Sequence, residues 1–399
     1  MSALLTDSTG QQALALAAAQ DDPGSVQAAT RLRAQFSSEL ATAALHQEAL
    51  RRRARAKLGD RAADMLFTAD GLEQATRPEV SRWRFARLVA AGITRVVDLG
   101  CGIGADAMAA LDAGLDVVTI ERDAEVAEFA RHNLAVANGQ AGPGTAEVVV
   151  ADAIDWAAAH LHSSSPTTAV LLDPARRTDR GRTWRVEDLS PPWDFVLDVL
   201  AAGRPAVVKL GPGIDRSMLP QVPTSHVSHG GDAVETTLWG GPPGVAFPGV
   251  EAVVIDRAGT VHTLSGQPRA VPFGPLGSWL HEPDPAVSRA GLVGLLGDDL
   301  VQLDPTAGYY SGNVDLTSPF VTSFEVLEVL EASPRRLKAW VRDHGAGTLE
   351  IKKRGRGGLL DVDPAALRRQ LKPKGPASAT IVLAPTGEGV RAIVCRRAG

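Results

Sequence analysis

Four carboxylates, each placed where a short apolar run ends, are the residues of this chain best suited to chemistry. The first, Asp98, follows a β-branched pair and precedes three glycines at alternate positions, Gly100, Gly102 and Gly104. Glycine lets the backbone turn sharply and approach a ligand closely, because no Cβ stands in the way. An Ala-rich helical segment begins directly after the turn, so its unpaired N–H groups are expected to face whatever lies there. Strand, glycine turn and helix in this order predict the first half of a βαβ nucleotide-binding unit.

The other three acids, Glu121, Asp152 and Asp173, end later runs rich in Val, Ile and Leu. Strand and helix patterns alternate from Arg95 to about Gly240, which predicts a doubly wound α/β sheet. Because ligands of such sheets lie outside the carboxyl ends of the strands, all four acids are expected to meet at one edge. Strands are expected at 95–98, 116–121, 146–151, 168–173, 205–210 and 233–239, and helices at 104–113, 123–138, 153–160 and 191–202.

The same residues also match a dinucleotide-binding fingerprint. Gly100, Gly102 and Ala105 satisfy G-x-G-x-x-A, and Glu121 lies at a distance that suits a ribose contact. Asp98, taken as a fixed negative charge at the end of the first strand, would repel a pyrophosphate and attract an ammonium or sulfonium ligand. A nicotinamide enzyme therefore remains only an alternative.

The run Asp98-Leu-Gly-Cys-Gly-Ile-Gly104, followed in order by Glu121, Asp152 and Asp173-Pro-Ala-Arg176, resembles the class I S-adenosylmethionine-dependent methyltransferases. The resemblance implies a Rossmann-like sheet with antiparallel closing strands, here 205–210 and 233–239, and S-adenosyl-L-methionine as the cofactor. It implies that the glycine turn faces the methionine part of the cofactor, that Glu121 holds the ribose and that Asp152 lies by the adenine amino group. The implied cofactor-binding residues are Asp98, Gly100, Cys101, Gly102, Gly104, Glu121, Arg122, Asp152 and Ala153.

The segment that would meet the methyl acceptor is Asp173-Pro-Ala-Arg176, which makes Asp173, Pro174 and Arg176 the candidate catalytic residues. In relatives that methylate exocyclic amino groups of bases, this run is Asp or Asn, Pro, Pro and an aromatic residue. Here Ala175 and Arg176 take the last two places, so the aromatic platform is missing or replaced by a guanidinium plane. A strand-ending turn or a cis bond at Asp173–Pro174 is the structural alternative.

Two further observations bear on the acceptor. Carbon-5 methylation of pyrimidines needs a cysteine nucleophile, but Cys101 lies inside the cofactor turn and Cys395 lies in an expected C-terminal strand. The segment after the acceptor motif contains five arginines and one tryptophan, and it predicts a loop in which Arg177 and Arg182 contact phosphates while Trp184 stacks on a base. A solvated arginine loop with Trp184 packed on the core is the alternative.

Charge is distributed unevenly along the chain. Residues 331–399 carry fifteen Lys or Arg and six Asp or Glu, a balance of +9, whereas residues 1–330 carry −14. A basic module joined to an acidic body is expected where one part holds an anionic polymer. The run Gly347–Gly355 resembles a THUMP-like module, and THUMP modules proper bind structured RNA. The resemblance implies phosphate contacts for Lys352, Lys353 and Arg354, with a domain that only braces the catalytic one as the alternative.

The first 91 residues are predicted to be helical, with one helix over Ser25–Lys57 and another over Glu79–Ala91 that Thr76 caps. The basic end of the first helix, Arg51–Lys57, either complements the helix dipole or faces RNA. Residues 74–77 are second-tier candidates to cover the cofactor. The expected domains are an N-terminal helical region at 1–91, a methyltransferase domain at 92–263, a connecting region at 264–319 and a small C-terminal α/β THUMP-like domain at 320–399.

The expected function is transfer of a methyl group from S-adenosyl-L-methionine to RNA, with a base nitrogen favoured over carbon-5. The alternatives are a small-molecule or protein acceptor, and a non-catalytic RNA-binding relative. A cytoplasmic location is expected, because no secretory signal or apolar run of about 20 residues is present. No metal site is expected, because His226 and His229 lack a third ligand and are expected on the surface.

Overall fold

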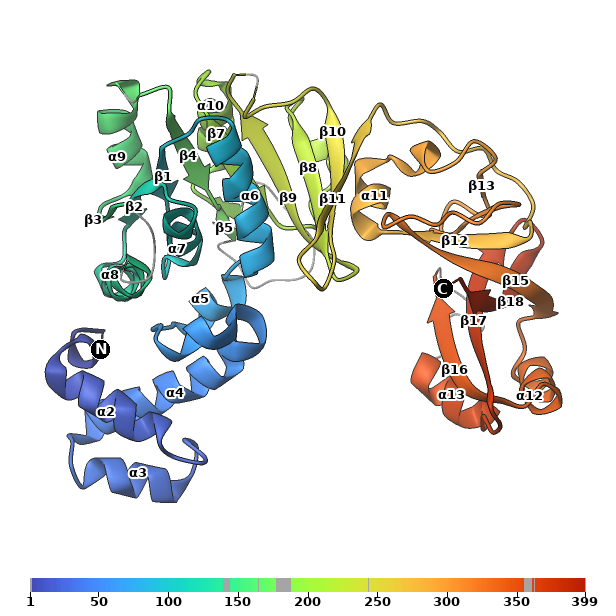
Figure 1. The fold of residues 1–399 in the computed structure, drawn as a ribbon, viewed down its shortest axis with the longest axis horizontal. Helices are drawn as coiled ribbons and strands as arrows, with labels where there is room; N and C mark the ends of the chain where they lie inside the picture. Colours follow the sequence, from blue (N-terminus) through green and yellow to red (C-terminus); the bar gives the residue numbers. More distant parts are fainter. Residues whose placement is uncertain are drawn as a thin grey trace. The chain divides into compact units, whose positions relative to one another are not determined.

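The computed structural model describes residues 2–138, 144–163, 165–176, 188–242, 244–354, 361 and 363–398 (Figure 1). Contacts between Cα atoms divide the chain into two compact units. The first unit comprises Met1–Thr224 and Glu235–Pro248, and the second comprises Ser225–Val234 and Gly249–Gly399. Within the described helices, none has the length and apolar character needed to cross a bilayer.

Helices open the first unit, as expected, but the single helix predicted over Ser25–Lys57 is wrong. The chain forms two helices there, because the Oγ of Ser37 accepts the N–H of Leu40 at 3.2 Å and so starts a new helix. The N-terminal elements are α1 (Ser2–Thr6), α2 (Ser8–Ala18), α3 (Val26–Arg33), α4 (Ser38–Leu58), the 3-10 turn η1 (Gly59–Ala63), α5 (Ala69–Gln74) and α6 (Pro78–Ala90).

The basic end of α4 is bound to the protein's own groups. Arg51 is buried and donates from Nε to the carbonyl oxygen of Met65 at 2.8 Å. Lys57 donates to the carbonyl oxygen of Glu73 at 2.7 Å. Gly59 ends the helix with a φ of 68°. These contacts favour the interpretation of the run as the end of a helix over an RNA-facing patch.

The central part of the first unit is the doubly wound sheet that the sequence predicts. Its strands lie in the order β9-β7-β4-β1-β2-β3, with β4, β1, β2 and β3 parallel and β7 parallel to β4. β9 pairs antiparallel with β7, so the expected antiparallel closing strands are present. The strands are β1 (Arg95–Leu99), β2 (Asp116–Glu121), β3 (Ala146–Val150), β4 (Thr168–Leu172), β7 (Ala206–Leu210) and β9 (Asp232–Gly240), and the helices are α7 (Ala105–Asp112), α8 (Ala124–Asn138), α9 (Ala153–His160) and α10 (Trp193–Ala201).

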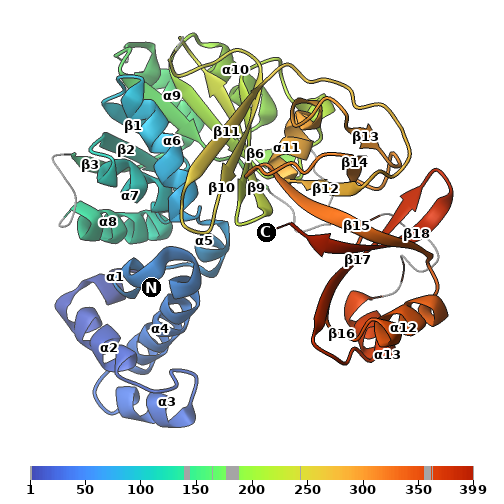
Figure 2. The same cartoon turned by 45° about the vertical axis from the view of Figure 1, so that its right-hand side comes forward.

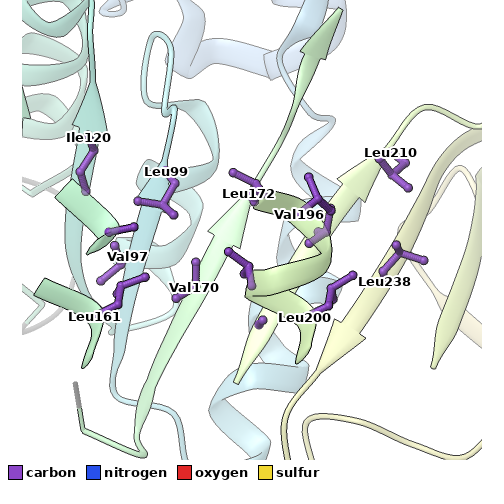
Figure 3. Close-up of a cluster of buried hydrophobic side chains, with 14 of the residues drawn as sticks. Val97, Leu99, Ile120, Leu161, Val170, Leu172, Val196, Leu200, Leu210 and Leu238 are labelled. Atoms are coloured by element: carbon purple, nitrogen blue, oxygen red, sulfur yellow. The ribbon is translucent and has the colours of Figure 1, made fainter. Parts of the chain in front are cut away.

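One face of this sheet packs on α9, α10 and the short turn η2 (Leu161–Ser163), and Figure 3 shows the side chains that meet there. Val97 and Val170 contribute from adjacent parallel strands, and Val196 and Leu200 contribute from α10. Parallel strands covered by helices are apolar along most of their length, which is why the strand runs read as continuous Val, Leu and Ile. A short antiparallel pair, β5 (Ala175–Arg176) and β6 (Leu189–Ser190), follows β4.

Asn133 on α8 joins the N-terminal helices to the sheet layer. Its Oδ1 accepts the N–H of Leu66 at 2.7 Å, and its Nδ2 donates to the carbonyl oxygens of Leu66 at 2.9 Å and Ile103 at 2.8 Å. The side chain is fully buried, so no water is expected to replace these bonds. The carbonyl group of Ile103, inside the glycine turn, is therefore bound by the same amide that holds Leu66.

The second unit contains two strand groups. β8 (Thr224–His229), β10 (Val250–Ile255) and β11 (Val261–Gly266) lie side by side, and β8 was not predicted. His226 on β8 is only 2% exposed, so the prediction of a surface histidine is wrong. A short helix, α11 (Pro285–Ala290), is capped by Asp284 and ends at Gly291, whose φ is 73°. The 3-10 turn η5 (Val293–Leu295) follows.

From β15 onward, the C-terminal part of the second unit alternates strand and helix and ends in two strands, as expected for a small α/β domain. Its sheet has the strand order β13-β14-β12-β15-β18-β17-β16. α12 and α13 cover one face, where Trp340 and Leu367 pack, while Phe324 and Tyr309 lie in the cluster on the other (Figure 2). The elements are β12 (Trp279–Pro283), β13 (Val301–Gln302), β14 (Tyr310–Gly312), β15 (Val321–Glu331), α12 (Pro334–Asp343), β16 (Ala346–Lys353), α13 (Pro364–Leu371), β17 (Ala377–Thr386) and β18 (Gly389–Arg397).

An Asn133→Ala variant is expected to lose about 2–3 kcal/mol in free energy of unfolding, because it leaves three buried backbone groups without their partner. The measurement is urea unfolding of the full chain. Arg131→Ala is the matched control on the same helix, since its ion pair with Glu128 is partly exposed and should contribute no more than about 1 kcal/mol. Equal losses in the two variants would contradict this account of Asn133.

Candidate active site at the glycine turn

The turn between β1 and α7 has the backbone that only glycine adopts without strain. Gly100, Gly102 and Gly104 have φ angles of 93°, 54° and 79°. A Cβ on Gly102 would meet no heavy atom within 4 Å, so glycine is required there by the backbone conformation and not by lack of space. α7 begins at Ala105, so the N-terminus of a helix adjoins the turn.

Glu121, at the end of β2, fixes this turn from the side. Its Oε2 accepts the N–H of Gly102 at 3.0 Å, and its Oε1 accepts the N–H of Asp123 at 2.9 Å. Asp152, after β3, caps α9 in a similar way, since its Oδ1 accepts the N–H groups of Ile154 at 2.9 Å and Asp155 at 3.3 Å. Both carboxylates are therefore held by backbone donors before any ligand is considered.

A cavity of about 330 Å³ opens over these groups. The structure brings together most of the predicted cofactor residues around it, together with Asp173, and the second-tier candidates Gln74 and Ala75 also line it. The predicted residues that line the cavity are Gly100, Cys101, Gly102, Glu121, Arg122, Asp152, Ala153 and Asp173.

Several predicted residues lie elsewhere. Asp98, Gly104 and Pro174 do not line the cavity. Pro174, the residue after Asp173, is buried. The backbone of Arg176 lies in β5, and its side chain is not described. Arg177, Arg182 and Trp184 fall outside the described residues, so their predicted phosphate and base contacts stay predictions.

Some lining residues were not predicted. Ser190, Pro191 and Pro192 reach the cavity because β6 pairs with β5 directly after Asp173 and Pro174. The Pro-Pro pair itself is the only signal in the sequence that suggests them, since it resembles the middle of the acceptor motif. The peptide bond of Ser190–Pro191 is cis.

Asp106, also unpredicted, lines the cavity and sits at the centre of a buried charge cluster. Its Oδ1 accepts Arg84 Nη1 at 2.7 Å and Ser81 Oγ at 2.8 Å, and its Oδ2 accepts Lys209 Nζ at 2.6 Å. Burial disfavours the charged carboxylate, but the charges of Lys209 and Arg84 outweigh burial and lower the pKa of Asp106.

The predicted helix cap at Thr76 is wrong because this cluster takes its hydroxyl. Thr76 Oγ1 donates to Asp106 Oδ2 at 3.0 Å. The N-cap of α6 is Arg77, which caps it with no side-chain hydrogen bond, and Pro78 occupies the first turn. A polar contact from a distant element thus replaces the local cap.

Lys209 on β7 joins Asp106 to the acceptor carboxylate. Its Nζ lies 2.5 Å from Asp173 Oδ2 and 2.6 Å from Asp106 Oδ2. On the far side of Asp106, Arg84 Nη2 lies 2.5 Å from Glu235 Oε2. Burial disfavours the charge on Lys209, yet Asp106 and Asp173 raise its pKa above the ordinary lysine value. Lys209 therefore stays charged and cannot serve as a base.

Asp98 differs from the expectation of a fixed negative charge. It is 3% exposed, and burial together with the charges of Asp106 and Asp173 raises its pKa to about 8, against the opposing charges of Lys209 and Arg84. At neutral pH the carboxyl group is therefore mostly protonated. Sequence spacing located the group correctly at the strand end but did not reveal its burial.

The thiol of Cys101 faces a related environment. Burial, followed by the charge of Asp98, raises the pKa of Cys101 well above the ordinary thiol value. Burial also raises the pKa of Cys395 to about 12. Neither thiol is available as a thiolate nucleophile at neutral pH. In the described part of the chain, no group of three or more His, Cys, Asp or Glu residues is placed to hold a metal ion.

The predicted RNA contacts on β16 are engaged with the protein's own acids. Lys352 Nζ lies 2.6 Å from Glu282 Oε2, and Arg354 Nη2 lies 3.4 Å from the other oxygen of the same carboxylate. Lys353 is half-buried on the same strand. Phosphate contacts by these three residues remain a prediction.

The chain is similar to known proteins over most of its length. A protein of Mycobacterium tuberculosis (strain CDC 1551), named an uncharacterized S-adenosylmethionine-dependent methyltransferase, is 34% identical over 365 residues, which span 87% of this chain and 94% of that protein. A protein of the H37Rv strain with the same descriptive name matches equally. The chain belongs to the S-adenosylmethionine-dependent methyltransferases. The enzyme uses S-adenosyl-L-methionine as its cofactor.

Two further comparisons concern the two ends of the chain and the fold. Residues 321–397 match the family model described as THUMP domain-like, and residues 1–54 match a domain of unknown function. A crystal structure from Porphyromonas gingivalis W83, described as a methyltransferase, superposes with a TM-score of 0.74 at 21% identity, covering 98% of this chain and 99% of that one. At this identity the superposition shows a shared fold.

The titration of Asp98 is expected to appear in cofactor binding. S-adenosylmethionine carries a sulfonium charge that S-adenosylhomocysteine lacks, and Asp98 becomes negative only above its raised pKa of about 8. The affinity ratio of the first compound to the second should therefore rise by about tenfold between about pH 7 and pH 9. Calorimetry of wild type and Asp98→Asn measures it, and the same rise in the variant would contradict the assignment.

Proposed function

We propose that this methyltransferase acts on RNA and that the acceptor is a base nitrogen. The observation that carries the proposal is Asp173, which lines the cofactor cavity with a side chain 44% exposed and is followed by Pro174. Lys209 Nζ donates to Oδ2 of Asp173, and within the described residues no hydrogen bond reaches Oδ1 of Asp173. A carboxylate oxygen at this place can accept a hydrogen of an amino group.

The cofactor site is part of the same proposal. The glycine turn offers N–H groups and close backbone approach for the methionine part, Glu121 suits the ribose hydroxyls, and Asp152 and Ala153 lie beside the adenine. S-adenosylmethionine supplies an electrophilic methyl group on sulfur. The protein then has to hold the acceptor in line and keep water away. Cytoplasmic location belongs to this proposal as well.

The environment of the acceptor favours a nitrogen over carbon-5. Pro191 and Pro192 give the cavity an apolar wall near Asp173 on which a base ring can lie, in place of the aromatic residue that the motif lacks. Carbon-5 chemistry needs a thiolate, and burial keeps the Cys101 thiol protonated by raising its pKa. A base amino group requires only an acceptor for its hydrogens.

The support for RNA comes from a basic surface on α12 and α13, which pack together through Leu337 and Leu367. Its cations are all exposed, and within the described residues none of them forms an ion pair, unlike Lys352 and Arg354 on β16. Exposed cations without internal partners are available to replace the counterions of a phosphate backbone. We call these residues the α12–α13 surface: Arg335, Arg336, Lys338, Arg368, Arg369, Lys372 and Lys374.

Methyl transfer tests the acceptor. Asp173→Ala should retain cofactor binding and lose methyl transfer by about 10²-fold, because the acceptor is no longer oriented. The assay follows methyl label into RNA extracted from a strain that lacks the gene. Asp194→Ala, which removes an exposed acid at the start of α10, is the control. Label found only in protein or in a small metabolite would exclude RNA as the acceptor.

RNA binding tests the α12–α13 surface. Arg336→Glu combined with Arg369→Glu should weaken binding of structured RNA at least about tenfold and reduce the slope of log affinity against log salt by about 1 per lost contact. Fluorescence anisotropy over a salt series measures both. The matched control, Arg53→Glu with Arg55→Glu, reverses two exposed arginines on α4. A loss confined to the control pair would place the phosphate contacts on the N-terminal helices.

A further inference from the structure

The burial of a charged lysine, Lys209, is not explained by cofactor binding or by packing of the core. Lys209 is only 4% exposed, yet it carries a charge, and it reaches two carboxylates that line the cofactor cavity, Asp106 and Asp173. Burying a lysine is costly, and replacing a buried ion pair with apolar side chains often leaves a protein as stable or more stable. Stability alone is therefore a weak explanation for this residue.

Asp106 has hydrogen-bond donors besides Lys209. Arg84, Ser81 and Thr76 all donate to it, and Arg84, which also pairs with Glu235, lies 2.7 Å from its Oδ1. Asp173 is in the opposite situation. Within the described residues, Lys209 is the one side chain that donates to its carboxylate. Lys209 is therefore one of four side-chain donors to Asp106 but the single one to Asp173 among the described residues, so the orientation of Asp173 is the more sensitive to it.

We propose that Lys209 is the positioning residue of the acceptor carboxylate: it fixes Oδ2 of Asp173 so that the other oxygen is presented to the hydrogen of the methyl acceptor. The inference rests on the proposed function, because it assumes that the acceptor meets Asp173. Among the described residues, the hydrogen bonds of Lys209 go to Asp106 and Asp173 and Lys209 does not line the cofactor cavity, so its proposed effect on the acceptor passes through Asp173.

The same ammonium group links the segment that would hold the methyl donor to the carboxylate that would meet the methyl acceptor. Asp106 lies in the first turn of α7, directly after the glycine turn, and Asp173 follows β4. Lys209 bridges one oxygen of each carboxylate at 2.6 and 2.5 Å. Arg84 then ties Asp106 to α6. These ion pairs thereby fix the position of the Asp173 carboxylate relative to the backbone that would hold the methyl donor.

The test compares Lys209→Met with wild type. We expect kcat to fall about 10²-fold while KM for S-adenosylmethionine and the Kd for S-adenosylhomocysteine change by less than about twofold. Lys209→Gln, which keeps a neutral hydrogen-bond donor, should lose less than Lys209→Met. Arg61→Met, which removes the ion pair between Arg61 and Asp112 outside the cofactor cavity, is the control and should keep the wild-type kcat.

A double-mutant cycle with Asp173→Ala decides whether Lys209 acts through that carboxylate. Adding Lys209→Met to Asp173→Ala should cost less than about threefold, because no carboxylate is left to orient. Effects that multiply would overturn the proposal, and so would a wild-type kcat in Lys209→Met or a loss of S-adenosylhomocysteine binding. If Lys209→Met does not fold, Lys209→Gln completes the cycle with the same criteria.

Counting the total methyl label tests the role of Lys209 whether or not the acceptor is RNA. Methyl label is counted in the whole extract of a strain that lacks the gene, before RNA, protein and small molecules are separated. If the acceptor is not RNA, the label moves to another fraction but the effect of Lys209 on the total remains measurable. If Lys209 has no positioning role, the totals for wild type and Lys209→Met agree whichever fraction carries the label.

Discussion

The parallel register of β4, β1 and β2 determines where every group of the candidate site lies. Leu99 is level with Ile120 on one side and with Leu172 on the other. The next residue of each strand, Gly100, Glu121 and Asp173, therefore emerges at the same edge of the sheet. A shift of one residue in any strand would turn its side chains to the opposite face and separate these groups. The cavity exists because three chain segments end at one level.

The second constraint is the compensation of buried charge. Two buried cations, Arg84 and Lys209, face four carboxyl groups, which lie on β1, α7 and β9 and directly after β4. Among the described residues no ion pair reaches Asp98, and burial together with the charge of Asp106 raises its pKa. Charge in this edge of the sheet is therefore balanced partly by ion pairs and partly by a retained proton.

Much of this arrangement follows from sequence patterns that are local. Glu121 and Asp152 could be placed because each ends a short apolar run, and the order of the C-terminal elements follows from clear amphipathic segments. Lys209 and Asp106 could not be connected from the sequence, since 103 positions separate them and no spacing rule links them. The charge of Asp98 depends on burial, which a motif does not report. The break at Ser37 depends on one side-chain hydrogen bond within an otherwise helical pattern.

The C-terminal sheet has one exposed edge at β16. Among the described strands of that sheet, β16 is outermost and pairs only with β17. An outermost strand has free peptide groups that can recruit a strand from another molecule, and charged side chains discourage such pairing. Glu350, Lys352 and Lys353 supply that charge within four residues. These charges are therefore expected to oppose aggregation, because they discourage the unpaired edge of β16 from pairing with the same edge of another molecule.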